Sequence, residues 1–134
     1  MSESVDTRLK IVTWNEVVLE SFKDASRLAR ADVELSDGAD ALSSGVFHSI
    51  MFYRADGTST YSTVMRLEAS LEGRTGSFVV IGEGTFDGTT AIGRFHSIEG
   101  SGTALLRDLR CDIESIATHA DYPFMPLSMT YHWA

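Results

Sequence analysis

Hydrophobic and polar residues alternate through most of this chain in segments of roughly eight to ten residues. The clearest run covers residues 47–102, where the segments are separated at Asp56-Gly57, Glu72-Gly73, Asp87-Gly88 and residues 100–102. Alternation with a period of two places side chains on opposite faces of a strand, and Asp-Gly between two strands is typical of a hairpin turn. Residues 47–102 therefore predict successive antiparallel hairpins.

The same pattern predicts about eight strands in the whole chain. They fall at residues 10–14, 30–35, 45–54, 60–67, 77–81, 90–98, 105–118 and 125–133, where 105–118 is one strand or a bulged pair. At this number of strands a closed barrel holds either packed side chains or one small ligand. We expect an all-β fold, an eight-stranded antiparallel β-barrel, and a single domain over residues 1–134.

Residues 15–29 have a different period. Val18, Phe22, Ala25 and then Leu28 or Ala29 recur at helical spacing, which predicts a short amphipathic helix. Its apolar stripe suits the covering of one barrel end or a subunit interface. The alternative is a lid that closes over a bound substrate.

The alternation also assigns side chains to faces. Residues 45–54 place one set on one face, namely Phe47, Ser49, Met51 and Tyr53, and the other on the opposite face, namely His48, Ile50, Phe52 and Arg54. Both faces carry apolar residues, which predicts an outer surface that packs against another subunit and hence a homo-oligomer, a dimer or a trimer. In residues 60–67 the predicted inward set is Tyr61, Thr63, Met65 and Leu67. A shift of one residue would exchange the two faces.

Short motifs along the chain resemble a known family. They are Tyr53-Arg54, Asp56-Gly57-Thr58, Leu71, Gly73-Arg74, Gly76-Ser77-Phe78, Gly84-Thr85-Phe86-Asp87 and Gly100-Ser101-Gly102-Thr103, with Trp14-Asn15-Glu16 upstream and Leu109-Arg110 and Tyr131 downstream. In this order they resemble the allene oxide cyclase-like barrel, and are most similar to small bacterial proteins of that fold whose function is largely unassigned. The resemblance covers nearly the whole chain and implies a calycin-like barrel.

The chain departs from that family at positions that bear on a cavity. Family members often carry acidic residues where His48 and Met65 stand here, and small residues where Cys111 and Ile113 stand. The resemblance therefore implies a tighter and more apolar cavity. Allene oxide cyclases act on an unsaturated fatty-acid epoxide by restricting its conformation and excluding water, without a strong nucleophile.

Composition and charge exclude several classes of function. The chain of 134 residues has a formal net charge of −8 and no Lys/Arg cluster, so we expect no nucleic-acid partner. It has no signal-like start and no long apolar run, so we expect a cytoplasmic protein with no membrane partner. Cys111 is the only cysteine, and we interpret it as a core residue.

Candidate chemistry is sparse. No standard catalytic motif occurs, and the four histidines are too scattered to predict a metal site, so we expect no cofactor and no metal. The candidate catalytic residues are His48, Tyr53 and Tyr61, because imidazole and phenol groups exchange protons or hydrogen bonds with a substrate. The candidate substrate-binding residues are Trp14, Phe22, Ile50, Phe52, Met65, Phe95, His96, Met129, Tyr131 and Trp133.

Three functions are compatible with this pattern. The first is a cofactor-independent cyclase or isomerase that acts on a small hydrophobic substrate, such as a polyene, a fatty acid or a polyketide-like compound in secondary metabolism. The alternative is a non-catalytic barrel that binds a small hydrophobic molecule, which the missing acidic residues favour. A third is a filled barrel that acts through its oligomer surface. We favour the enzyme narrowly, because an apolar stripe beside a barrel mouth suits a site that must exclude water.

Overall fold

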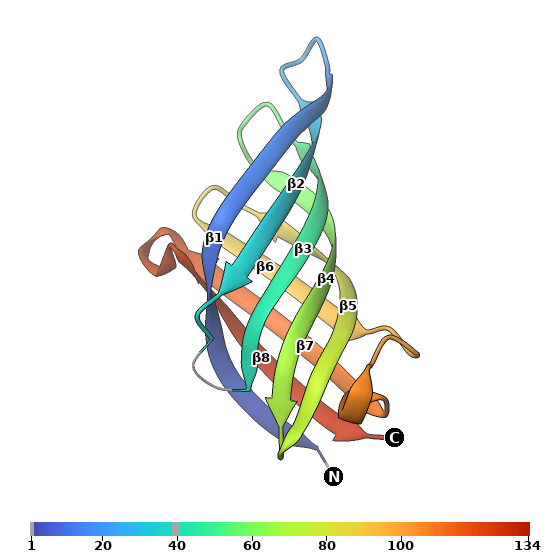
Figure 1. Cartoon of the computed structure of the whole chain (residues 1–134). Coiled ribbons are helices and arrows are strands. Elements are labelled where there is room, and N and C mark those ends of the chain that lie inside the picture. Colours follow the sequence, from blue (N-terminus) through green and yellow to red (C-terminus); the bar gives the residue numbers. More distant parts are fainter. Residues whose placement is uncertain (1, 39–40) are drawn as a thin grey trace.

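The computed structural model describes residues 2–38 and 41–134 as eight β-strands that close into a barrel (Figure 1). The strands are β1 (Glu3–Ser21), β2 (Arg27–Ser36), β3 (Leu42–Tyr53), β4 (Ser59–Leu71), β5 (Arg74–Phe86), β6 (Thr90–Ser97), β7 (Leu109–Thr118) and β8 (Phe124–Trp133). Each strand pairs antiparallel with the next, and β1 pairs with β8. The predicted all-β, eight-stranded antiparallel barrel is confirmed.

Two 3-10 helices, η1 (Ala104–Leu106) and η2 (His119–Asp121), lie in the connections before β7 and β8. Residues 105–118 therefore divide into part of η1 and the strand β7. The predicted turns at Gly57 and Gly88 are confirmed, since both glycines have positive φ. In each turn the preceding aspartate accepts a hydrogen bond from a backbone N–H two residues on, Asp56 from Thr58 at 2.9 Å and Asp87 from Thr89 at 2.9 Å.

The helix predicted over residues 15–29 is wrong. β1 continues to Ser21, and a tight turn leads directly into β2. Asp24 closes the turn by accepting a hydrogen bond from the backbone N–H of Ser26 at 3.0 Å. The helical spacing of the apolar residues does not produce a helix. Val17 and Val18 are β-branched, and β1 pairs with β2 from Lys10 to Ser21.

Inward and outward faces follow the alternation in the sequence. On β4, Thr63, Met65 and Leu67 point inward and are at most 3% exposed. On β3, Ile50 and Phe52 point outward and are 47% and 38% exposed. The register pairs each inward residue of one strand with an inward residue of its neighbour, as the closed ladder requires.

The barrel interior has two unlike halves. One end holds both termini, the β4–β5 turn and η1 (Figure 1). Its interior is filled by buried leucines and a phenylalanine, namely Leu9, Leu35, Leu42, Leu67, Leu71, Phe78, Leu106, Leu109 and Leu127. We call this the closed half. The hairpins that follow β1, β3, β5 and β7 lie at the other end, which we call the open half.

The strand ladder is incomplete in the open half. β1 pairs with β8 only from Glu3 to Lys10, and β7 pairs with β8 only from Leu109 to Glu114. Among the described residues, no ladder pair joins residues 11–21 of β1 to residues 115–118 of β7.

Candidate functional site

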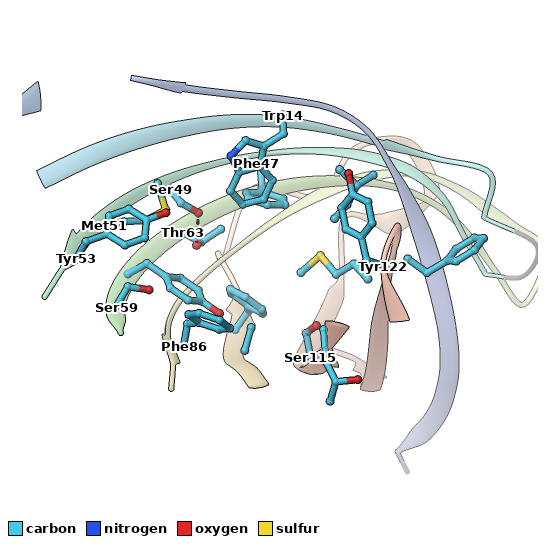
Figure 2. Close-up of a pocket in the computed structure, with 18 residues that line it drawn as sticks. Trp14, Phe47, Ser49, Met51, Tyr53, Ser59, Thr63, Phe86, Ser115 and Tyr122 are labelled. Atoms are coloured by element: carbon cyan, nitrogen blue, oxygen red, sulfur yellow. Dashed lines mark hydrogen bonds between the residues drawn. The ribbon is translucent and has the colours of Figure 1, made fainter. Parts of the chain in front are cut away.

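A cavity of about 300 Å³ occupies the open half of the barrel (Figure 2). Figure 2 shows side chains from several strands around it, with Trp14 and Phe47 on one side and Ser115 on another. The lining residues are Ile11, Trp14, Phe47, Ser49, Met51, Tyr53, Ser59, Tyr61, Thr63, Phe86, Ala91, Phe95, Ser115, Ala117, Thr118, Tyr122, Phe124 and Met125.

The walls are aromatic and uncharged. Eight lining residues are Phe, Tyr or Trp, and none is Asp, Glu, Lys, Arg or His. Trp14 meets Phe47 edge to face, with ring centroids 6.1 Å apart. Alanines at positions 91 and 117 lie opposite each other on β6 and β7 and leave space between the rings. Such a cavity suits an uncharged, apolar molecule.

Glycines determine how Tyr61 lies. Tyr61 on β4 is opposite Gly84 on β5, and Gly84 is opposite Gly93 on β6. A Cβ atom on Gly84 would stand 2.4 Å from the Tyr61 ring and 2.5 Å from its hydroxyl oxygen. The ring therefore lies flat across β5, which is possible only because no side chain stands there.

Hydroxyl groups supply the polar part of the cavity. Ser49 and Thr63 hydrogen-bond each other at 2.6 Å and so satisfy one another (Figure 2). Ser59, Tyr61 and Ser115 make no side-chain hydrogen bond to any other described residue, although Ser59 and Ser115 are only 4% and 5% exposed. Burial raises the pKa of Tyr61, so its hydroxyl stays protonated. These three hydroxyls are free to bind a ligand.

Charged groups stand at the rim. Glu16 accepts hydrogen bonds from Trp14 Nε1 at 3.1 Å and from the Tyr53 hydroxyl at 3.2 Å. The guanidinium carbon of Arg27 lies 4.1 Å from the Tyr53 ring centroid. Burial, followed by the nearby Glu16 carboxylate, raises the pKa of Tyr53 to about 12. Tyr53 is therefore a proton-bearing donor held toward Glu16.

Four of the predicted site residues line the cavity: Trp14, Tyr53, Tyr61 and Phe95. Four others lie on the outer face of the sheet and do not line it, because alternation turns them away from the interior: His48, Ile50, Phe52 and His96. The His48 Nδ1 atom is 2.7 Å from the Asp32 carboxylate on the neighbouring strand. The placement of these four residues in the interior is wrong.

The other predicted residues also lie away from the cavity. Phe22 stands in the β1–β2 turn, 43% exposed, because the lid helix is absent. Met65 and Met129 are at most 1% exposed in the core and do not line the cavity. Tyr131 and Trp133 belong to the closed half, where Trp133 Nε1 donates to Glu72 at 2.9 Å.

Sequence reasoning missed most of the polar lining. Ser49, Thr63 and Ser115 were not among the candidate residues, although each alternates in step with buried apolar neighbours on its own strand. A serine in the inward register of a strand was the available signal. This signal identifies a cavity residue only when the register of the strands is known.

Among residues 2–38 and 41–134, no three His, Cys, Asp or Glu side chains gather closely enough to hold a metal ion. No helix within the described part of the chain is long and apolar enough to cross a membrane. Cys111 is buried as interpreted from the sequence, and burial raises its pKa to about 12.

Together, the fold and site define a small antiparallel β-barrel with one filled half and one hollow, aromatic half. The chain belongs to the family described as "Protein of unknown function (DUF3224)", which it matches over residues 6–128. It is similar to the crystal structure of a protein with unknown function from the DUF3224 family of Shewanella oneidensis MR-1. The two chains are 15% identical with a TM-score of 0.71, over 98% of this chain and 99% of that one. No curated protein matches the chain.

Proposed function

We propose that this protein binds one small, largely apolar molecule in the open half of its barrel. The observation that carries the proposal is the 300 Å³ cavity, whose lining is aromatic and uncharged. A cavity of about 150 Å³ with apolar walls holds benzene. Twice that volume suits a ligand of about a dozen non-hydrogen atoms. The cavity also argues against a filled barrel that acts only through its outer surface.

Binding fits the site better than the catalysis favoured by the sequence. That preference depended on a lid helix, and residues 15–29 form a hairpin instead. His48, the candidate acid or base, faces away from the cavity. The lining hydroxyls of Tyr53 and Tyr61 have raised pKa values and hold their protons, which suits hydrogen bonding more than proton transfer.

The test is denaturing extraction of the purified protein, followed by mass spectrometry of the released small molecules. It compares the native protein with Ala117→Phe, which fills the cavity from the β7 wall. Ile116→Phe is the matched control, because residue 116 neighbours Ala117 but faces outward and is 49% exposed. A compound released by the native protein and the control, but not by Ala117→Phe, supports the proposal. A compound released equally by all three contradicts it.

The second candidate is a cofactor-independent cyclase or isomerase. It is favoured by the Glu16–Tyr53 hydrogen bond at the rim, which joins a carboxylate to a cavity-lining phenol. The resemblance to the allene oxide cyclase-like barrels supports the same reading. If the extracted compound is a product, its linear isomer should be converted by the native protein and much more slowly by Glu16→Gln. Conversion that is unchanged in Glu16→Gln removes this pair from the mechanism.

The predicted homo-oligomer and the cytoplasmic location stay predictions. The exposed apolar residues Ile50, Phe52 and Val64 on the outer face fit a subunit contact. Light scattering of the purified protein would measure the oligomeric state directly.

A further inference from the structure

An interior row of residues crosses four strands in the open half. The register pairs Tyr61 with Gly84, Gly84 with Gly93, and Gly93 with Ser115. All four residues face the interior, and the two in the middle have no side chain. Tyr61 and Ser115 are therefore the polar residues at the two ends of this row, and the Phe95 ring lies over Gly93 between them, 2.7 Å from the position of an added Cβ.

Gly84 lets the Tyr61 ring lie across β5 with its hydroxyl toward β6. A Cβ atom on Gly93 would lie 3.6 Å from that hydroxyl oxygen, so the phenol reaches across β5 as far as β6. Opposite residues of antiparallel strands have Cβ atoms about 5 Å apart. Ser115 stands one strand further on, and the Phe95 ring over Gly93 lies between the two side chains, so each hydroxyl meets a ligand separately at the cavity wall.

Neither hydroxyl has a partner elsewhere in the described structure. Ser115 is 5% exposed and lines the cavity, and no described side-chain nitrogen or oxygen atom is both buried and without a partner, so its hydroxyl is accessible from the cavity. By contrast, the hydroxyls of Ser49 and Thr63 in the same cavity hydrogen-bond each other. Tyr61 and Ser115 are therefore, with Ser59, lining hydroxyls that can bond a ligand, and these two are the pair that the row of glycines aligns across the sheet.

We propose that the ligand is an uncharged, aromatic molecule whose polar atoms hydrogen-bond the hydroxyls of Tyr61 and Ser115. This inference rests on the proposed binding function and names the class of ligand. Aromatic walls favour a flat ring system, which offers edges and faces to the eight surrounding rings.

The ligand is uncharged because the cavity offers no partner for an ion. No lysine, arginine or histidine lines it, and a carboxylate taken out of water without a partner is strongly disfavoured. The net charge of −8 adds repulsion toward anions. The Glu16 carboxylate at the rim already accepts hydrogen bonds from Trp14 and Tyr53.

Four probes of about the right size separate these features: naphthalene, 2-naphthol, 2-naphthoate and 2-naphthylmethylammonium. Their dissociation constants are measured by equilibrium dialysis with the native protein, Tyr61→Phe, Ser115→Ala and the double variant. The informative quantity is the Kd of naphthalene divided by the Kd of 2-naphthol. The double variant should lower this ratio roughly three- to tenfold, because the hydrogen bond to the naphthol oxygen is lost while the cavity remains. The native protein should bind 2-naphthol more tightly than either charged probe.

Matched controls remove the same groups elsewhere. Tyr131→Phe deletes a phenol hydroxyl in the closed half, away from the cavity, and Ser62→Ala deletes a hydroxyl on the outer face of β4. Both should leave the ratio unchanged. Tyr61→Phe keeps the ring over Gly84, so it tests the inference even if Ser115→Ala does not fold.

The possible failures are distinguishable. If naphthalene binds and Ala117→Phe abolishes that binding, the proposed function stands. In that case a ratio unchanged in the double variant overturns the hydroxyl pair, as does tighter binding of either charged probe. If none of the four probes binds, both the proposed function and this inference are overturned.

Discussion

The position of Tyr61 over Gly84 makes a quantitative prediction for Gly84→Ala. The added Cβ would stand 2.4 Å from two atoms of the Tyr61 ring, where carbon atoms normally approach to about 3.5–4.0 Å. The ring must therefore tilt away from β5 and into the cavity. Gly84 does not have positive φ, so an alanine can adopt its backbone conformation.

Two opposing effects set the magnitude. Overpacking of this kind costs about 1–3 kcal/mol. Replacing glycine by alanine at a compatible backbone position stabilises by about 0.4–1 kcal/mol through the unfolded state. Gly84→Ala should therefore lower the free energy of unfolding by about 1–2 kcal/mol in the native sequence. In a Tyr61→Val background the ring is gone, and the same change should be neutral or stabilising.

Urea unfolding followed by circular dichroism measures all four proteins of this double-mutant cycle. The expected coupling between positions 61 and 84 is about 1–3 kcal/mol. If Gly84→Ala has the same effect in both backgrounds, the Tyr61 ring does not lie over Gly84, and the placement of its hydroxyl next to β6 is refuted with it. The Gly84→Ala protein should also bind naphthalene more weakly than the native protein, since the tilted Tyr61 ring takes up cavity volume.

Three further predictions follow from other side chains. Cys111 should resist iodoacetamide in the folded protein and react once urea unfolds the chain, because burial raises the pKa of its thiol to about 12. Mass spectrometry measures the modification, and fast reaction in the folded state would contradict the burial of Cys111. The pKa of Tyr53 rises from 10.0 in the unfolded chain to about 12 in the folded protein, so its contribution to stability is complete below pH 10.0 and is lost as the pH rises through about 12. Tyr53→Phe should flatten the loss of stability across that range in urea titrations, and an unchanged slope would argue against the shift. His48→Ala should leave the Kd of naphthalene unchanged within about twofold, because His48 bonds Asp32 on the outer face; a larger change would place it near the cavity.

The alternation of residues was enough to predict the strands and their faces. Thr63, Met65 and Leu67 were assigned to the interior from the sequence and are buried there. Alternation is a local property of two neighbouring residues, so it survives without knowledge of the partner strand. The length of a strand cannot be predicted in this way, since β5 extends well beyond the predicted residues 77–81 at both ends.

The candidate site was less predictable because it depends on long-range register. Ile50 and Phe52 were predicted to bind the substrate, although alternation places them on the opposite face of the strand from Tyr53. The importance of Ser115 depends on its alignment with Gly93, Gly84 and Tyr61 across three ladders. No single segment of the chain contains that information.

The position of the cavity follows from how the sizes of inward side chains change along the barrel. Eight strands fix the radius of a closed barrel, so the walls cannot contract around smaller residues. The closed half fills that radius with leucines, whereas β6 and β7 of the open half present Ala91, Ser115 and Ala117. Leucine at these positions would bury more apolar surface and pack the interior to the usual density. A sequence that departs from good packing along one half of its interior, and sets unpaired hydroxyls there, has the features expected of a binding site rather than of a core.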